Sequence, residues 1–206
     1  MLCLPLTMSA QGVWETPDDA STAAPVVKQA ASKKANADAR YLAGAVPEVD
    51  GKVVWTHAID VPGKSAQQLY DIMSARLGDM VKEENQREGS RIALVNRAEH
   101  KLVARMKEWL VFRNTVLSLD RTEMDYTLQV ECTDGRVSLI VDRISYLYPT
   151  GEGKKEAFKA DTWITDKYSM NKKGTRLYRI SGKFRRKTVD RMEELFADIE
   201  QTLKKH

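Results

Sequence analysis

The stretch Thr122-Glu-Met-Asp-Tyr-Thr-Leu-Gln-Val-Glu-Cys132 decides the fold, because polar and apolar side chains alternate along it without a break. A period of two with one apolar side is typical of a half-buried β-strand. Asp134-Gly135 follows and predicts a tight turn whose two central residues have positive φ. With a two-residue turn there, every cross-strand pair is apolar, which determines the register. The predicted pairs are Cys132 with Val137, Val130 with Leu139, and Leu128 with Val141.

The second strand of this hairpin predicts a β-bulge. Its apolar phase slips by one residue after Val141 and resumes at Ile144. One extra residue near Asp142-Arg143 would place Ile144 opposite Tyr126 on the apolar side. We therefore expect an antiparallel hairpin that is bent and locally unpaired at that point.

The flanking segments predict an α+β domain of order β-α-β-β-β-β-α. Ser65 and Gln68 have the spacing of a helix capping box, and one apolar stripe follows them. We expect a single domain over residues 41–206, an antiparallel sheet with both helices packed on one face. Glu108 interrupts the apolar side of its strand, which predicts a bulge or a strand end. The other predicted elements are strands over Lys52–Val61, Arg91–Arg97 and Lys101–Phe112, a connection over Asn114–Arg121, a charged loop over Pro149–Lys159, a short helix over Ala160–Met170 and a long helix from Thr175. The predicted buried set includes Trp55, Leu69, Met73, Leu77, Leu128, Val130, Leu139, Val141, Phe184, Met192, Leu195 and Ile199.

The composition is that of a globular protein with a distinct N-terminal region. The 206 residues are 42% hydrophobic and 30% charged, and the net charge of +4 does not by itself imply a nucleic-acid or membrane partner. No apolar run approaches the roughly 18 residues of a membrane span, so we do not expect an integral membrane protein. Residues 1–10 resemble the end of a signal peptide truncated at its N-terminus, and residues 11–40 resemble an Ala-rich linker with helix-forming composition around Val26–Ala39. These features predict a secreted or periplasmic protein.

The motifs predict no catalytic, cofactor or metal site. The three histidines, His57, His100 and His206, are far apart in the sequence and lack the spacing of metal ligands. Cys132 has no Cys-x-x-C companion and belongs to the apolar side of its strand, so no disulfide is expected. The candidate residues for chemistry are therefore few.

One stretch resembles a loosened phosphate-binding loop, Ala58–Ser65 between a strand and a helix. Such a loop wraps an anion with several backbone N–H groups. Here Ala58 replaces the first glycine and Pro62 removes one N–H group. A plain turn followed by a helix cap explains the stretch better.

Seven cationic residues gather around the start of the final helix, with Asp190 as the one acidic residue among them. They are Arg176, Arg179, Lys183, Arg185, Arg186, Lys187 and Arg191. A run of this kind is usually the solvated side of an amphipathic helix, although it also suits an anionic polymer or a polar partner. The candidate surface for a polar partner consists of Arg179, Lys183, Arg186 and Lys187.

Four stretches carry a family resemblance: Tyr41-Leu-Ala-Gly-Ala-Val-Pro-Glu-Val-Asp-Gly-Lys-Val53, Leu117-Ser-Leu-Asp-Arg-Thr122, Trp163-Ile-Thr-Asp-Lys-Tyr168 and Phe184-Arg-Arg-Lys-Thr-Val-Asp190. They resemble a secreted bacterial family of unknown function with a TATA-box-binding-protein-like (TBP-like), or helix-grip, fold. The resemblance implies that fold and an envelope location in Gram-negative bacteria, and it brings no catalytic residues.

DNA binding does not follow from the fold name. A TATA-binding protein uses two repeats and apolar wedges in the minor groove, whereas this chain has one repeat. The polar side of the strand over Thr122–Cys132 carries Glu123, Asp125 and Glu131, and these carboxylates would repel phosphates.

Two classes of function remain open. We favour a non-catalytic binding module of the cell envelope, for a small apolar ligand between the sheet and the final helix or for a protein partner or anionic glycan at the surface. The candidate ligand-lining residues are Trp55, Tyr126, Tyr146 and Phe184. The alternative is a hydrolase or lyase whose site forms in a cleft between sheet and helix, with His57 beside a distant carboxylate. A cavity of roughly 300 Å³ or more would favour the small ligand, and a filled core would favour the protein partner.

Overall fold

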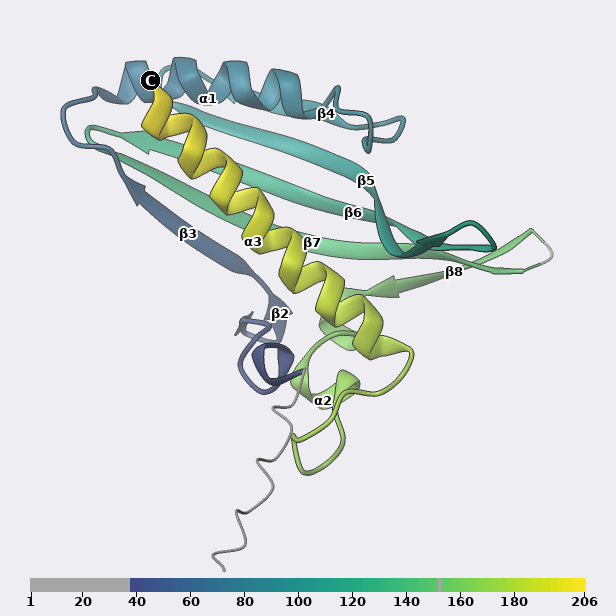
Figure 1. The fold of residues 1–206 in the computed structure, drawn as a ribbon. Helices are drawn as coiled ribbons and strands as arrows, with labels where there is room; N and C mark the ends of the chain where they lie inside the picture. Colours follow the sequence, from purple (N-terminus) through teal and green to yellow (C-terminus); the bar gives the residue numbers. More distant parts are fainter. Residues whose placement is uncertain (1–37, 152) are drawn as a thin grey trace, which may run out of the picture. The chain divides into compact units, whose positions relative to one another are not determined.

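The computed structural model describes residues 38–151 and 153–206, so the predicted signal-peptide remnant and residues 11–37 of the predicted linker lie outside the described residues. The strands are β1 (Glu48–Val49), β2 (Lys52–Val53), β3 (Trp55–Asp60), β4 (Arg91–Asn96), β5 (Lys101–Thr115), β6 (Ser118–Thr133), β7 (Arg136–Gly151) and β8 (Lys154–Lys159). The helices are η1 (Ala39–Tyr41), α1 (Ala66–Met80), η2 (Ala160–Thr162), α2 (Asp166–Ser169) and α3 (Ser181–Lys205). An antiparallel sheet has the order β3-β7-β6-β5-β4, and β8 follows β3 along the same edge of β7 (Figure 1).

The β6–β7 hairpin has the predicted register. The three predicted apolar pairs are present: Cys132–Val137, Val130–Leu139 and Leu128–Val141. In the turn, Gly135 has the expected positive φ of 72°, but Asp134 does not, so the prediction of two positive-φ residues is wrong. The Asp134 carboxylate instead accepts a hydrogen bond from the backbone N–H of Ala66 at 2.8 Å. The start of α1 therefore helps to set the conformation of this turn.

The predicted bulge in β7 is also present. The register between β6 and β7 shifts between Asp125 and Thr127, and Arg143 adopts a φ of 54°. Ile144 returns to the apolar side and is 4% exposed. A left-handed backbone conformation at a residue with a side chain is strained. The surrounding structure therefore holds Arg143 in a backbone conformation that it would not favour on its own.

The core lies between the sheet and the two long helices, which pack on the same face (Figure 1). All twelve residues of the predicted buried set are buried, and the capping box of Ser65 and Gln68 starts α1. Leu128 and Val141 are fully buried, whereas Gln129 and Asp142 on the opposite side are half-buried. The alternation along the hairpin thus determines which face of the sheet the helices cover.

Two segments are more regular than predicted. The prediction of a loop over Pro149–Lys159 is wrong, because β7 continues to Gly151 and pairs with β8. The connection predicted over Asn114–Arg121 is mostly strand, with a two-residue turn at Val116 and Leu117. Both segments lie at the end or edge of the sheet, where charged strands do not show apolar alternation.

The final helix is shorter than predicted. It begins at Ser181 rather than Thr175, and the short helix predicted before it is reduced to the single turns η2 and α2. Gly174 has a φ of 65° and lets the chain fold back, so that Met170 and Leu177 form an isolated β-bridge. Leu177 is buried although it lies in this loop. Its apolar side chain therefore continued the apolar stripe of the helix in the sequence and extended the predicted helix too far.

Residues just before the predicted boundary at Tyr41 contact α3. Arg186 binds Asp38 through two hydrogen bonds of 2.6 and 2.7 Å, and Arg40 pairs with Asp190 at 3.2 Å. These ion pairs fasten the end of the predicted linker to α3. In the described part of the chain, the helices lack the length or the apolar surface that a bilayer span requires.

The burial of Cys132 predicts an unreactive thiol. The residue is 2% exposed, and desolvation together with the nearby charge of Glu131 raises the pKa of its thiol to about 12. Because the thiolate is the reactive form, we expect iodoacetamide at pH 8 to leave Cys132 unmodified in native protein and to alkylate it in urea. Peptide mass spectrometry distinguishes it from Cys3. Rapid alkylation in native buffer would contradict the burial.

Candidate binding site

The four predicted ligand-lining residues belong to a filled core. Tyr126, Tyr146 and Phe184 are at most 2% exposed, and Trp55 is 8% exposed. The hydroxyls of Tyr146 and Thr188 are 2.8 Å apart, and the rings of Tyr146 and Phe184 meet edge to face at 5.1 Å. Burial raises the pKa of the Tyr126 and Tyr146 hydroxyls. The structure therefore places these four side chains within the packing between the sheet and α3, and of the four only Tyr146 also lines one of the described surface cavities, which has a volume of about 260 Å³.

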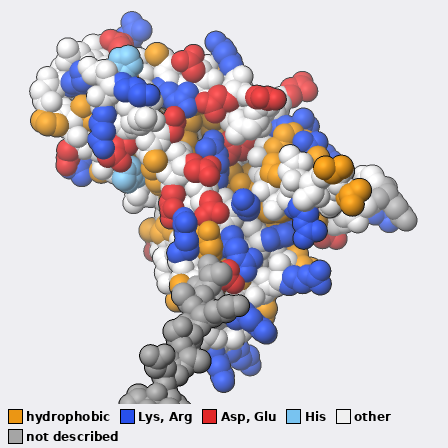
Figure 2. All heavy atoms as spheres, in the orientation of Figure 1, with side chains coloured by type: hydrophobic (Ala, Val, Ile, Leu, Met, Phe, Trp, Pro, Cys, Tyr) orange, Lys and Arg blue, Asp and Glu red, His pale blue; other side chains and the backbone are white. Residues whose placement is uncertain are grey.

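The predicted basic surface is only partly available to a partner. Lys183 donates to Asp120 at 2.8 Å and to the Tyr148 hydroxyl at 2.9 Å, and Arg186 is bound to Asp38. Arg179 and Lys187 remain exposed. In Figure 2, Lys and Arg side chains gather over the loop between α2 and α3, where Arg179 lies, more than along α3 itself. Of the predicted basic surface, Arg179 in this loop and Lys187 on α3 are therefore the two exposed members.

The face of the sheet opposite the helices carries charges of both signs. Each carboxylate that we expected to repel phosphates lies beside a cation of another strand. The pairs are Glu123–Lys155 at 2.9 Å, Asp125–Arg105 at 3.3 Å and Glu131–Lys101 at 3.5 Å. The hydrogen bond from Lys155 lowers the pKa of Glu123, against the opposing effect of burial. This face is therefore a mixed-charge surface rather than an acidic one.

His57 does not form an acid–base pair. Its ring stacks on Phe196 with centroids 5.0 Å apart, beside a cavity of about 380 Å³ that also contacts Glu200. Glu200 accepts a hydrogen bond from Lys204 at 2.6 Å, which lowers its pKa. Within residues 38–151 and 153–206, the His57 ring has no hydrogen bond to a carboxylate.

A larger cavity lies at the bulge of β7. It has a volume of about 450 Å³ and is lined by Lys52–Val54, Asp142–Ser145, Lys159 and Asp161. We call it the bulge cavity. Strand β3 pairs with β7 only up to Val141, and β8 pairs with it only from Ser145. The edge of β7 therefore has no strand partner over Asp142–Ile144, and the cavity occupies that gap.

The bulge cavity has an apolar floor and a surplus of positive charge. Val53 and Ile144 are buried at 1% and 4% exposure. Asp161 already accepts from the backbone N–H of Val53 at 2.8 Å and pairs with Lys52 at 3.2 Å. Of the remaining cations, Arg143 and Lys159 are exposed and have no carboxylate partner among the described residues.

Asp142 of β7 is the second carboxylate that lines the cavity, and its side chain contacts the neighbouring strand β6. Its Oδ2 atom accepts from Gln129 at 3.0 Å, while its Oδ1 atom is buried without a hydrogen-bond partner. Each buried polar atom of this kind is a place where a bound water or ligand group could be accommodated. The cavity thus combines free cations with one unsatisfied acceptor.

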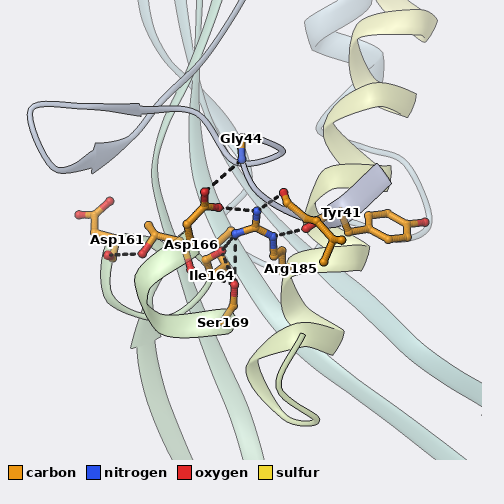
Figure 3. A network of polar contacts seen from close by, with 9 residues as sticks. Tyr41, Gly44, Asp161, Ile164, Asp166, Ser169 and Arg185 are labelled. Atoms are coloured by element: carbon orange, nitrogen blue, oxygen red, sulfur yellow. Dashed lines mark hydrogen bonds and ion pairs between the residues drawn. The ribbon is translucent and has the colours of Figure 1, made fainter. Parts of the chain in front are cut away.

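A buried arginine holds one wall of the cavity in place (Figure 3). Arg185 of α3 is 0% exposed and donates to the carbonyls of Tyr41, Leu42 and Ile164 at 2.5, 2.6 and 2.8 Å. It also binds the segment after β8, through Asp166 at 2.6 Å and Ser169 at 3.2 Å. These contacts use all five N–H groups of the guanidinium. They fix the chain that carries Asp161 against α3.

The sequence revealed the bulge but not the cavity beside it. Lys159 lies in the segment predicted as a loop and Asp161 in the segment predicted as a short helix, so the sequence places neither of them beside the bulge. The one signal in the sequence is Arg143. A non-glycine residue at a predicted bulge indicates a strained backbone that neighbouring residues must hold in place.

Comparison with known proteins places the chain in a family. Residues 55–147, from β3 through most of β7, match the model of DUF4468, a domain of unknown function with a TBP-like fold. A DUF4468 family protein from Bacteroides ovatus, solved by crystallography, is 40% identical, with a TM-score of 0.75 over 82% of this chain and 95% of that one. The chain belongs to the DUF4468 family.

DUF4468 membership confirms the predicted resemblance and the predicted fold class. A TBP-like protein from Parabacteroides distasonis is 21% identical, with a TM-score of 0.62 over 78% of this chain and 97% of that one. The comparison with curated proteins gives no match. The DUF4468 description assigns no activity, so the function must be argued from the site itself.

Proposed function

We propose that this DUF4468 protein is a non-catalytic binding module of the bacterial cell envelope that holds a small amphipathic anion in the bulge cavity. The observation that carries the proposal is Arg143, an exposed cation without a carboxylate partner among the described residues. It stands at a strained bulge beside a cavity of about 450 Å³. Strained residues that the structure supports are concentrated at binding sites. The volume is that of a small-molecule site.

The chemistry of the lining favours an anion with a short apolar part. A guanidinium binds a carboxylate or phosphate through two parallel hydrogen bonds, and Arg143 is free to do so. Lys159 adds a second positive charge from the adjacent strand. The floor of Val53 and Ile144 suits a hydrocarbon segment. The ligand would thus lie in the gap between β3 and β8, with its charged end at the bulge.

The envelope location in this proposal rests on the N-terminal sequence. Leu2, Leu4 and Leu6 precede Ser9-Ala10, the pattern of an apolar signal-peptide region and its cleavage site. Mass spectrometry of the native protein from cell fractions tests the location. A protein retaining Met1 in the cytoplasmic fraction would contradict it.

The substitution Arg143→Gly separates binding from folding. Glycine adopts a positive φ without strain, so we expect the free energy of unfolding to stay equal or rise by about 1 kcal/mol. Loss of the guanidinium should weaken binding by about 10- to 100-fold, the value of a charge-assisted hydrogen bond. Native mass spectrometry of protein purified from producing cells should show a small-molecule adduct that Arg143→Gly lacks.

The matched control is Arg105→Gln, which removes an exposed cation from β5 outside the cavity. It should keep the adduct. Equal adduct in Arg143→Gly and the unmodified protein, or an adduct in neither, would refute the proposed site.

A further inference from the structure

The tip of the β5–β6 hairpin exposes aliphatic side chains that the fold does not use. Val116 and Leu117 form the turn and are 103% and 96% exposed, and Leu119 is 54% exposed. None of them belongs to the core cluster. Tight turns ordinarily contain Gly, Asn or Asp, so two aliphatic residues there have no conformational reason. We call Asn114–Leu119 the hairpin tip.

The hairpin tip lies past the part of the sheet in which β5 and β6 pair with other strands. Strand β7 pairs with β6 only from Glu123 onward, and β4 pairs with β5 only up to Arg105. The last part of the hairpin is therefore a two-stranded ribbon at the same end of the sheet as the β7–β8 hairpin (Figure 1). Among the described strands, no third strand pairs with either edge of the tip.

The charges near the tip are positive. The stretch from Arg113 to Leu119 contains no acidic residue, and Asp120 is neutralised by Lys183 at 2.8 Å. Arg121 lies over the ring of Trp109 at 3.8 Å from its centroid. Moving back from the tip, the order is thus aliphatic residues, then arginines, then a tryptophan.

The separation of the aliphatic residues from Arg113 fits a membrane interface. Arg113 is three residues from Val116, which is about 10 Å along a strand. Apolar side chains inserted at an interface reach about 5–10 Å below the headgroups, and cations contact the anionic headgroups themselves. The arginine would stand at the headgroups with Val116 and Leu117 among the acyl chains.

We propose that the hairpin tip inserts into the interfacial region of an anionic lipid bilayer and holds the protein at a membrane surface. A specific protein interface buries about 800 Å² per partner, which a convex two-residue turn does not offer. A bilayer requires only exposed apolar residues and flanking cations. This inference is independent of the bulge cavity.

Vesicle co-sedimentation of the full chain tests the proposal. We expect binding to phosphatidylcholine vesicles that contain 30% phosphatidylglycerol and much weaker binding to pure phosphatidylcholine. The double variant Val116→Ser/Leu117→Ser should lose at least about tenfold in affinity for the anionic vesicles, because two large aliphatic side chains no longer leave water. The double variant Leu94→Ser/Val95→Ser is the matched control, since Leu94 and Val95 are 49% and 60% exposed on edge strand β4. It should bind as the unmodified protein does.

Tryptophan fluorescence gives an independent reading of insertion. Leu117→Trp should add emission that shifts to shorter wavelength on addition of anionic vesicles, and thermal unfolding checks that each variant is folded. Absence of binding to anionic vesicles, equal losses in both double variants, or an unshifted Leu117→Trp emission would overturn the proposal.

Discussion

Arg185→Met should lower the free energy of unfolding by about 3–5 kcal/mol, the range for removing one partner of a buried ionic network. The guanidinium of Arg185 is fully buried and satisfies three backbone carbonyls together with Asp166 and Ser169. Methionine fills a similar volume but donates no hydrogen bond, so the Tyr41 carbonyl loses its donor, the Leu42 and Ile164 carbonyls each lose one of two donors, and the Asp166 carboxylate loses its ion pair. Urea unfolding followed by circular dichroism measures the loss.

Arg179→Met is the control for this experiment, because Arg179 is exposed and surface substitutions change stability by at most about 0.5 kcal/mol. A loss below 1 kcal/mol for Arg185→Met would show that the network contributes little. Arg185→Met should also weaken ligand binding in the bulge cavity, because it releases the segment that carries Asp161.

Glu108→Leu should destabilise the protein by about 3 kcal/mol. Glu108 is 0% exposed in the middle of β5 and accepts hydrogen bonds from Arg191 of α3 at 2.7 and 3.0 Å, with a further one from Gln86 at 3.0 Å. Burial disfavours the charge on Arg191, but the hydrogen bond that it donates to Glu108 and the nearby negative charges together outweigh this effect and raise the pKa of the guanidinium. Removing the carboxylate leaves a largely buried cation without its counter-ion.

The double variant Glu108→Leu/Arg191→Met should recover most of this loss. Hydrophobic side chains of similar volume commonly replace a buried ion pair without a stability penalty. Chemical unfolding of both single variants and the double variant gives the coupling energy. Additive losses in the double variant would contradict the interpretation of Glu108 and Arg191 as one unit.

The sequence predicted the hairpin because its register follows from local alternation. Along Thr122–Cys132 every second residue is apolar, and a slip by one residue would expose the whole apolar set. The same alternation located the bulge at Asp142-Arg143, where the phase changes. These features are encoded in neighbouring residues, and the structure confirms them.

Other features depend on residues far apart in the sequence. Glu108 reads as a break in its strand until Arg191, 83 residues later, is seen to neutralise it. The aromatic residues Tyr126 and Phe184 point toward the core whether the core is filled or hollow, so the sequence could not reveal that the space is filled. The bulge cavity forms only because β8 stops short of β3 along β7, a gap that no local pattern encodes.

The most direct test of the proposed binding site is a titration of ¹⁵N-labelled protein with octanoate, an amphipathic anion with a short apolar chain. We expect saturable changes in amide chemical shift confined to Lys52–Val54, Arg143–Ser145 and Lys159–Asp161, with octanol giving much smaller changes because it lacks the charge. Arg143→Gly should abolish the saturable response. Shifts spread over the core or over α3, or equal responses to octanoate and octanol, would contradict a site at the bulge for an amphipathic anion.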